Sequence, residues 1–373
     1  MRLSTELQTH RGQRSAISVV IPTRGNPESV ERLLRSLAAA AEGSVYAEIF
    51  VVDDSDPREA ERIRAHCSAF DARYVGGPRN VGAKRNLGAS QAANEVVLFV
   101  DSDCVATPDL LAHHLAAHES LDQRFIGVAG TTLFHGKANF GAKVVERSMV
   151  YEMFSGPRIY DEMLWATTSN LSVRKHAFLE MGGFDEKPLT VVGGEDVDFG
   201  LRAARLGQAI RACAKAEVLH SRPDRAPLRG SARKLFRYGI ADTWLCDRYP
   251  RSRRVCANPA ILAPAAFALG AVIGRSRWLV AGILLSALTL LAVYLVEVRK
   301  RRERRADWRY SIADLFSVVF DWSYDLGVVC GGIITGKPWL CFTRFEYTPV
   351  GAFVSDIGSR DPDSSDAEAA GRR

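Results

Sequence analysis

Two carboxylates separated by one serine, Asp101 and Asp103, are the residues of this 373-residue chain best suited to chemistry. They follow the apolar run 96–100, whose length and β-branched content predict a strand buried on both faces. The carboxyl ends of such strands line the crevice where open α/β sheets bind ligands. Carboxylate oxygens suit Mg²⁺ or Mn²⁺, and a divalent cation suits a phosphate-bearing substrate. In the structural alternative, Asp101 and Ser102 only turn the chain and Asp103 caps the next helix.

A second acidic pair, Asp53 and Asp54, ends the apolar stretch 48–54. A carboxylate at the end of a strand can accept hydrogen bonds from a nucleobase or a ribose. A simple turn through Asp56 and Pro57 explains the same residues equally well.

Residues 76–88 place Gly82 just before a predicted helix with Lys84 and Arg85 in its first turn. Cations at this end oppose the helix dipole, so they cost stability unless an anion lies nearby. A diphosphate would supply that anion. The glycines do not follow the first strand in the dinucleotide-binding pattern, which argues against a dehydrogenase.

A third acidic group, Glu195, Asp196 and Asp198, falls in the first turn of another predicted helix. Carboxylates are favoured there whatever the function, so a purely structural interpretation is strong. Gly193 and Gly194 come directly before them and let backbone approach closely, as the wall of a binding site requires.

Four histidines are candidates for metal binding. His220 stands at the end of a predicted strand, 209–219, where it could supply a third metal ligand, although a single histidine is more often structural. His113, His114 and His118 lie at helical spacing, and a solvated helix face explains them better than a metal site.

The order of predicted elements indicates an α/β fold. From residue 17 onward, strand patterns alternate with helix patterns, which builds a parallel sheet by right-handed crossovers. Residues 15–105 are the expected nucleotide-binding half, and residues 106–225 are the expected acceptor half. The seven cysteines include no CxxC pair, which favours free thiols in a reducing compartment over disulfides or a structural zinc site.

Two apolar runs, 255–274 and 278–296, are each about one bilayer thick at helical rise. Basic segments outside both runs predict a transmembrane helical hairpin with both ends cytoplasmic. Pro259 and Pro264 weaken the first run, so one span plus a half-inserted helix is an alternative, as is a pair of buried helices in a soluble protein.

The net charge of +6 is concentrated beside these apolar runs. This position favours attraction to membrane lipids over nucleic acid as the reason for the charge. The expected organisation is a flexible amino terminus (1–14), a catalytic domain (15–225), a basic juxtamembrane segment (226–254), the hairpin (255–298), a basic and amphipathic interfacial segment (299–354) and a disordered tail (355–373).

Seven pieces of the chain, taken in order, resemble family 2 glycosyltransferases of the GT-A fold. They are VVIPTRG at 19–25, VVDDSD at 51–56, RNVGAKRNLG at 79–88, VDSD at 100–103, SNLSVRKHAFLEMGGFDE at 169–186, GEDVDFGLR at 194–202 and His220. Each piece alone is weak evidence for this family, but seven pieces in the right order are specific for it. The resemblance covers residues 15–225 and implies a mostly parallel sheet flanked by helices, followed by carboxyl-terminal membrane helices.

The resemblance also implies roles for residues near the donor. Asp53 and Asp54 would hold the nucleotide, with Pro22 and Arg24 lining the base pocket. The full set that it places near the donor is Pro22, Arg24, Asp53, Asp54, Lys84, Arg85, Asp101 and Ser102.

Metal and catalytic roles follow from the same resemblance. Asp101 and Asp103 match a DxD motif, with Asp103 the more direct ligand of a divalent cation, Mg²⁺ or Mn²⁺, and His220 completing the site. Asp196 would be the general base, next to Glu195.

The implied reaction is inverting transfer of a sugar from a UDP-, GDP- or dTDP-linked donor to a hydroxyl of a glycan or lipid-linked acceptor. It would take place at the cytoplasmic face of the cell (inner) membrane. The QxxRW motif of processive enzymes is missing, and RKLFRYG at 233–239 occupies the comparable region, which favours non-processive transfer. The alternatives are a catalytically inactive, membrane-anchored binding protein of the same fold, or a sugar nucleotidyltransferase.

Overall fold

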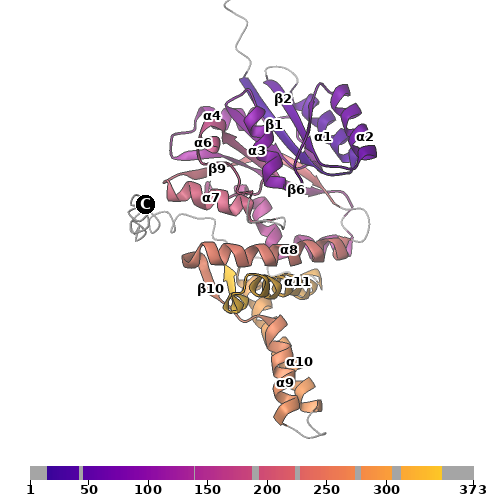
Figure 1. Cartoon of the computed structure of the whole chain (residues 1–373), viewed down its shortest axis with the longest axis vertical. Coiled ribbons are helices and arrows are strands. Elements are labelled where there is room, and N and C mark those ends of the chain that lie inside the picture. Colours follow the sequence, from indigo (N-terminus) through magenta and orange to yellow (C-terminus); the bar gives the residue numbers. More distant parts are fainter. Residues whose placement is uncertain are drawn as a thin grey trace, which may run out of the picture.

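The computed structural model describes residues 15–41, 45–137, 139–186, 193–222, 227–273, 279–304 and 312–346. The predicted flexible amino terminus, 1–14, and the predicted disordered tail, 355–373, lie outside the described residues. Within the described ranges the chain forms an α/β domain with a helical carboxyl-terminal part (Figure 1).

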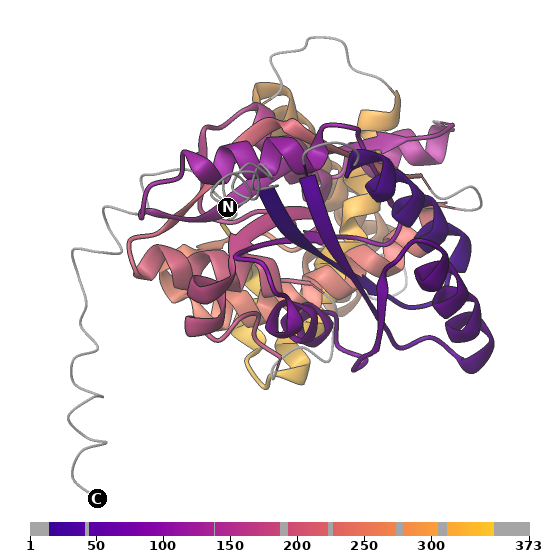
Figure 2. The ribbon, with the colours of Figure 1, turned by 90° about the horizontal axis from the view of Figure 1, so that it is seen from above.

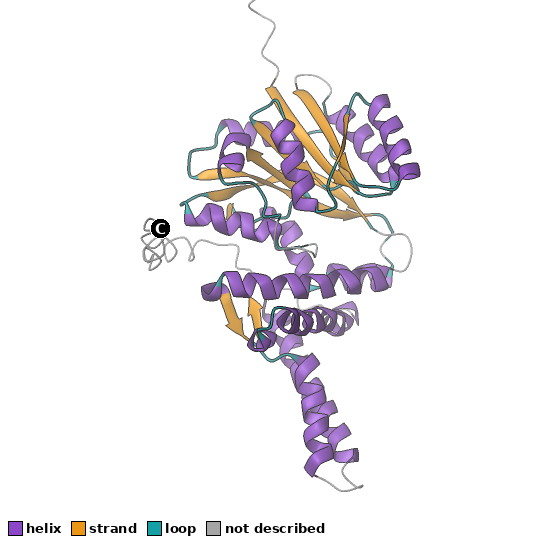
Figure 3. Ribbon diagram, in the orientation of Figure 1, coloured by secondary structure: helices purple, strands orange, loops and turns teal. Residues whose placement is uncertain are grey.

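A large mixed sheet forms the middle layer of the α/β domain, in the upper part of the molecule (Figure 3). Its strands are β1 Ser15–Thr23, β2 Val45–Asp53, β3 Arg73–Gly76, β4 Val96–Val100, β5 Cys104–Ala106, β6 Phe125–His135, β7 Glu162–Met163, β8 Asn170–Arg174 and β9 Ala209–Ser221. Their order is β3-β2-β1-β4-β8-β6-β9-β5, with β7 paired to β9.

The predicted parallel sheet is confirmed over its first half. Strands β3, β2, β1 and β4 are parallel, as their helical crossovers require. Antiparallel pairs then appear at β4–β8, β6–β8 and β5–β9, whereas β6 and β9 run parallel. Because β5 returns to pair with the end of β9, the chain just after β4 meets the predicted histidine.

Helices cover both faces of the sheet (Figure 2). The helices of this domain are α1 Pro27–Ala40, α2 Pro57–Ala69, α3 Val81–Gln91, α4 Leu110–Glu119, α5 Phe140–Glu146, α6 Lys175–Glu180 and α7 Glu195–Arg205, with a 3-10 segment at Met149–Arg158. Helix α5 packs on the carboxyl-terminal helices α8 (Pro227–Arg248) and α11 (Ile312–Ile334). Helices α1, α2 and α4 pack on one face, whereas α3, α6 and α7 pack on the other. The alternation of strand side chains explains the two cores, since Val19 faces one and Val20 faces the other.

Two predicted surface histidines are in fact internal. His114 is fully buried and contacts Ser172 and Asn170, each at 2.8 Å, and His118 also contacts Ser172 at 2.8 Å. Burial lowers the pKa of His114 to about 4 and that of His118 to about 3, so both rings are neutral. The expectation of a solvated face was wrong because polar side chains of β8 satisfy the rings from inside.

The carboxyl-terminal part lies beneath the sheet (Figure 1). It comprises α8 Pro227–Arg248, β10 Arg253–Val255, α9 Pro259–Ile273, α10 Leu279–Arg304, α11 Ile312–Ile334 and β11 Thr343–Phe345, with 3-10 turns at Pro250–Ser252 and Pro338–Phe342. Helices α8 and α11 pack together below the α/β domain, and α9 and α10 form a hairpin that projects away from it. The Ser286 hydroxyl donates to the Ala263 carbonyl across 2.6 Å and links the two arms of the hairpin.

Two described helices are long and apolar enough to cross a membrane. Only 6% of the stretch Gly282–Arg299 of α10 is buried inside the protein, whereas 56% of the stretch Ile312–Ile334 is buried. Helix α9 has 15 residues and contains Pro264, so the first arm of the predicted hairpin falls short of a full span in the described part of the chain.

Helix α11 has the character of an amphipathic helix. Its acidic residues face the protein, where Asp314 pairs with Arg147 at 2.8 Å, Asp321 bonds Ser148 and Asp325 pairs with Arg344. An exposed apolar stripe runs along its other side: Ile312, Leu315, Phe316, Val319, Leu326 and Ile333. Helix α11 therefore packs on the protein by its acidic side and leaves an apolar stripe exposed.

Candidate functional site

The pairing of β5 with β9 brings two predicted metal ligands together. Cys104 lies opposite His220, so the preceding Asp103 lies beside the imidazole, with His220 Nε2 at 3.3 Å from Asp103 Oδ1. His220 Nδ1 lies 3.2 Å from the carbonyl oxygen of Ser221, which can only accept, so Nδ1 carries a proton. Nε2 of the neutral ring and the carboxylate are then two facing acceptors, which need a proton or a cation between them.

The donor atoms at this point suit a hard or borderline divalent cation. Ligand atoms of Asp103, Cys104 and His220 lie within 4.8 Å of one another. Burial, and then the charges of Asp101 and Asp103, raise the pKa of the Cys104 thiol well above its ordinary value, so it stays a neutral and poor ligand. An aspartate oxygen and an imidazole nitrogen remain, a pair that fits Mn²⁺ or Mg²⁺ better than a soft ion.

Aromatic rings hold His220 in place. Its ring centroid lies 5.5 Å from that of Phe134 and 6.3 Å from that of Phe154. Since 13% of its side chain is exposed, the imidazole is fixed by packing but open toward Asp103.

Arg85 joins the predicted catalytic and donor residues in one ion-pair network. Its Nη2 donates to Asp101 at 2.8 Å, and its Nη1 donates to Glu195 at 3.0 Å. Arg85 and Glu195 are buried, whereas one third of the Asp101 side chain is exposed. The structure thus gives Asp101 an arginine partner, and a metal role for Asp101 stays a prediction.

Asp196 lies next to this network at the start of α7. Burial and the neighbouring Glu195 carboxylate raise its pKa to about 7, against the lowering effects of the Val197 N–H and Arg85. The Val197 N–H donates to Asp196 Oδ1 across 2.9 Å. A carboxylate with this pKa can exchange a proton near neutral pH, which a general base requires.

Lys84, next to Arg85 on α3, belongs to a second charged group. It ion-pairs with Asp54, and Arg24 Nε lies 3.7 Å from the other oxygen of Asp54. Helix α3 begins at Val81 with an Asn80 cap, so Lys84 and Arg85 do lie in its first turns, as the sequence predicts. The protein's own carboxylates balance these cations, so a diphosphate is not required to explain them.

Asp53 is buried at the end of β2 and already hydrogen-bonded. It accepts from the Ser55 N–H at 2.9 Å and from the Tyr74 hydroxyl at 3.0 Å. Among the other predicted donor residues, Pro22 is buried in β1, Arg24 is exposed and Ser102 is half-buried. Their contacts with a nucleotide stay predictions.

Helix α8 adds residues that the sequence reasoning missed. Lys234 Nζ lies 5.6 Å from the centre of the Tyr238 ring. Tyr238 and Tyr151, together with Asp103 and Asp101, raise the pKa of Lys234, so this lysine carries its charge toward the acidic strand end. The spacing of four between Lys234 and Tyr238 puts them on one helix face, and that spacing was a usable signal.

The Tyr238 ring also explains why position 193 is a glycine. A Cβ on Gly193 would lie 2.5 Å from the Tyr238 ring, and its φ of +122° disfavours other residues. The close approach expected at Gly193 is therefore confirmed, with α8 as the other wall.

The third acid of α7 is structural. Asp198 is fully buried and accepts from Arg202 at 2.9 Å, Arg248 at 2.9 Å and the Tyr249 hydroxyl at 2.6 Å. This cluster fastens α7 to the end of α8, which keeps Asp196 and Lys234 in a fixed relation.

Comparisons with known proteins show what this chain is similar to. Residues 18–181 match the family described as Glycosyl transferase family 2. The chain is 29% identical over 294 residues to the Pre-mycofactocin glycosyltransferase of Mycobacterium tuberculosis, covering 72% of this chain and 56% of that relative. It is 24% identical over 251 residues to Glycosyltransferase AglE of Haloferax volcanii, covering 62% of this chain and 75% of the relative. The chain therefore spans little more than half the length of the first relative.

One solved structure shows a shared fold. The mannosyltransferase PcManGT from Pyrobaculum calidifontis, in complex with GDP-Man and Mn²⁺, superposes with a TM-score of 0.54 at 15% identity, covering 85% of this chain and 88% of that one. The GT-A type α/β fold expected from the sequence is thereby confirmed.

Proposed function

Because residues 18–181 form a domain of glycosyl transferase family 2, we propose that this protein is an inverting glycosyltransferase that moves a sugar from a nucleoside-diphosphate sugar to an acceptor hydroxyl. The observation that carries this proposal is the Asp196 carboxylate, whose pKa is raised to about 7 beside the Arg85 network. Proton acceptors work best when their pKa lies near the working pH.

A divalent cation is part of the proposal, with Asp103 and His220 as the residues that would hold it. The two facing acceptors fit such an ion. When bound, it would stabilise negative charge on the leaving diphosphate as a Lewis acid. The identity of the ion, Mg²⁺ or Mn²⁺, is left open.

Lys234 of α8 supports a diphosphate donor. Tyr238 and Tyr151, together with Asp103 and Asp101, raise its pKa, so the lysine keeps its positive charge near the end of β4. Preorganised cations of this kind stabilise developing negative charge more effectively than water does. The donor is UDP-, GDP- or dTDP-linked in this proposal, and GDP-Man is the donor named for the neighbour from Pyrobaculum calidifontis.

The role proposed for Asp196 is to accept the proton of the acceptor hydroxyl as that oxygen attacks the anomeric carbon. The new bond forms on the face opposite to the departing diphosphate, so the anomeric configuration inverts. Glu195, held by Arg85, keeps the Asp196 pKa high and is a positioning residue.

We place the enzyme at a membrane, with the catalytic domain on the cytoplasmic face of the cell (inner) membrane and a glycan or lipid-linked acceptor. The exposed apolar surface of α10 and the apolar stripe of α11 support this placement. The residues 233–239 lack a QxxRW motif and present Lys234 and Tyr238 instead, which supports non-processive transfer.

A donor screen tests the proposal. Purified protein with Mn²⁺ and a panel of nucleotide sugars should release nucleoside diphosphate with one class of donor, and Asp196→Asn should remove that activity. NMR of the product should show an inverted anomeric configuration. Release of pyrophosphate would indicate a nucleotidyltransferase, and binding without turnover of any donor would indicate an inactive binding protein.

A further inference from the structure

Strand β9 carries three extra residues midway along its pairing with β6. Gly130 of β6 is paired with Cys213 of β9. The next residue of β6, Thr131, is paired with Glu217, so residues 214–216 form a bulge in the ladder.

This bulge decides which face of the sheet the second half of β9 presents. Side chains of a regular strand alternate, so residues of even number would all lie on one face. Before the bulge, Ile210 packs into the core beneath α3, α6 and α7, whereas Val218, after the bulge, packs into the core beneath α1, α2 and α4. An odd number of extra residues produces this switch. The face on which His220 lies, two positions after Val218, therefore depends on the bulge.

The bulge also sets how far along the sheet His220 lies. The last part of β9 pairs with β5, and the pairing of Cys104 with His220 puts the imidazole beside Asp103. Without the three extra residues, each later residue of β9 would move about 10 Å along the strand. Because that distance would take His220 away from Asp103, the bulge has to be held in this one place.

The side chain of Asn170, in β8, holds the bulge. Its amide nitrogen donates to the Thr131 carbonyl at 3.0 Å and to the Ala216 carbonyl at 2.9 Å, so it fastens β6 to the end of the bulge. At the start of the bulge, the Thr131 hydroxyl donates to the Ala214 carbonyl at 3.0 Å. A Cβ on Gly130 would lie 2.3 Å from Asn170 Nδ2, so the glycine leaves the room that the amide occupies.

A chain of buried hydrogen bonds orients the Asn170 amide. Since its nitrogen donates twice, its oxygen is the acceptor of the 2.8 Å bond from His114 Nε2. Nδ1 of this neutral ring then accepts from the Ser172 hydroxyl at 2.8 Å, and His118 Nε2 donates to the same hydroxyl oxygen at 2.8 Å. The direction of each bond is fixed, so the amide cannot turn round without leaving buried groups unpaired.

We propose that Asn170 is a positioning residue for the metal ligand His220, and that His114 and Ser172 hold the Asn170 amide in orientation. By joining β6 to the bulge, Asn170 fixes the register in which β9 reaches β5, and with it the contact between His220 and Asp103. This role gives a physical reason for Asn170 and Ser172 in the SNLSVRK segment at 169–175. The inference rests on the divalent-cation site proposed above.

A cysteine crosslink reads this register without metal or donor. The Ser221 N–H donates to the Asp103 carbonyl at 2.9 Å, which makes Cys104 and position 220 a non-hydrogen-bonded pair, the kind whose side chains lie closer. In full-length protein with His220→Cys, copper phenanthroline at alkaline pH should join the introduced thiol to Cys104. Mass spectrometry of the linked peptides measures the yield. Adding Asn170→Ser should leave little of this crosslink, because a shifted β9 separates the two sulfurs.

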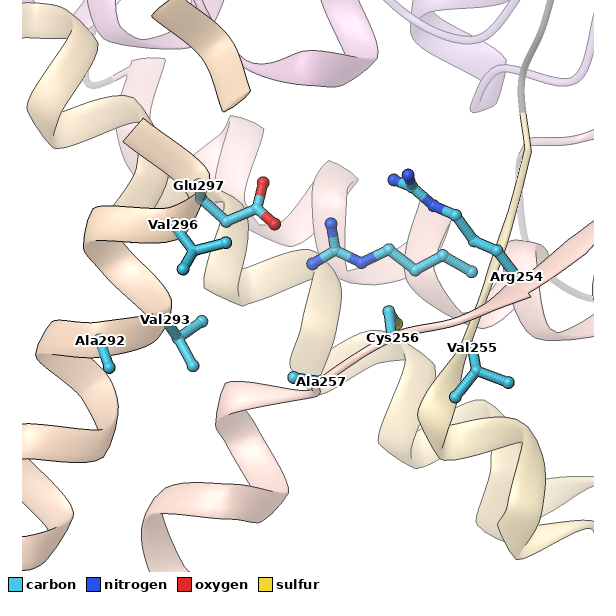
Figure 4. Close-up of a pocket in the computed structure, with 9 residues that line it drawn as sticks. Arg254, Val255, Cys256, Ala257, Ala292, Val293, Val296 and Glu297 are labelled. Carbon is cyan, nitrogen blue, oxygen red and sulfur yellow. The ribbon is translucent and has the colours of Figure 1, made fainter. Parts of the chain in front are cut away.

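Asn258→Ser is the matched control. Asn258 is also buried, and its amide nitrogen also donates to two carbonyl oxygens, those of Asp325 at 3.2 Å and Cys341 at 3.0 Å. It lies in the carboxyl-terminal part of the chain, directly after Ala257 in the wall of a pocket beside α10 (Figure 4). The control loses the same kind of bonds, but it should keep the crosslink.

Binding of Mn²⁺ connects the register to the proposed cation site. With His220 in place, Asn170→Ser should bind Mn²⁺ about 10–100-fold more weakly in calorimetry, whereas Asn258→Ser should bind it as the wild type does. A lost crosslink, with Mn²⁺ binding unchanged or already absent in the wild type, would contradict the cation site and support the register role of Asn170 alone.

A folded Asn170→Ser variant that crosslinks as fully as Asn258→Ser would overturn the inference. If circular dichroism shows that Asn170→Ser does not fold, Ser172→Ala decides the question. This variant removes the hydrogen bond that fixes the His114 ring and, through it, the amide. Slower crosslinking than in Asn258→Ser then supports the inference, and equal crosslinking overturns it.

Discussion

Arg85 Nη1 donates to Glu195 Oε1 across 3.0 Å, although the two residues are 110 positions apart in the sequence. Through its second nitrogen, Arg85 also holds Asp101, so one buried guanidinium links α3, the end of β4 and the start of α7. These three elements carry most of the predicted site, and their relative position depends on this one side chain.

Replacing Arg85 with Ala should therefore damage both stability and activity. Loss of one partner leaves Glu195 as a buried, uncompensated charge, at a cost of about 3–5 kcal/mol in the free energy of unfolding. Arg85→Lys keeps the charge but cannot bond both carboxylates with one planar group, so it should restore part of the stability and little activity. Urea unfolding and donor turnover measure the two effects. The exposed Arg79, mutated to Ala, is the control, and an equal loss in both variants would contradict the network's role.

The sequence predicted the fold where local patterns were strong. Buried apolar runs such as Val96–Val100, alternating with helix patterns, predicted the first four strands and their crossovers. The pairing of β5 with β9 was not predictable, because β5 has only 3 residues and its partner is more than 100 positions away. The family resemblance placed Asp103 and His220 in one metal site, and the structure brings their side chains to 3.3 Å, but the strand pairing that does so could not be read from the sequence.

Side-chain partners were harder to predict than positions. Lys84 and Arg85 were assigned to a diphosphate because cations oppose the helix dipole, yet the carboxylates of Asp54, Asp101 and Glu195 already balance them. His114 looked solvent-facing because its partners, Ser172 and Asn170, come from a strand far along the chain. In both cases the missing information was long-range burial, which periodicity does not contain.

Removing the proposed metal ligands should abolish cation-dependent turnover. Asp103→Ala and His220→Ala each delete one of the two proposed ligand atoms, so Mn²⁺ binding measured by calorimetry should weaken by at least about 10-fold. Chelation of the wild type should give the same loss of activity, reversed by added Mn²⁺. Normal turnover in Asp103→Ala with chelator present would remove the cation from the mechanism.

Lys234→Gln should raise the KM for the donor about 10-fold with a smaller effect on melting temperature, because its charge faces the acidic strand end rather than a fixed ion-pair partner. Arg233→Gln is the matched control, since Arg233 is exposed and adjacent on the same helix. If both variants changed KM equally, α8 would act only through its general positive charge.

The hairpin should hold the protein in the membrane fraction of a detergent-free lysate. Leu288→Lys combined with Leu291→Lys puts two charges on the exposed face of α10, at a cost of about 2.5–3.5 kcal/mol each near the bilayer centre. The double variant should shift toward the soluble fraction. Full recovery of the wild type in the soluble fraction would contradict the membrane placement.

The pKa of Asp196 makes the pH dependence of transfer the sharpest test of the base. Burial and Glu195 raise this pKa to about 7, so activity should increase as pH rises through 7 and Asp196 becomes ionised. Asp196→Asn should still bind donor but transfer it about 10²–10⁴-fold more slowly. Glu195→Gln removes a negative neighbour, so the Asp196 pKa should fall and the acidic limb of the profile should move to lower pH.

The same pKa predicts an effect on stability, because the folded state holds the Asp196 proton more tightly than the unfolded chain does. Stability is therefore lost as pH rises from the ordinary aspartate value toward about 7. Asn does not ionise, so Asp196→Asn does not lose this stability. The melting temperature of the variant minus that of the wild type should therefore increase between pH 4 and 7 and stay constant above pH 7. Glu195→Gln should show a smaller gain over the same range. Two results together would exclude Asp196 as the titrating base. The melting temperatures of wild type and Asp196→Asn would differ by the same amount across this pH range, and Glu195→Gln would leave the acidic limb of the pH–activity profile in place.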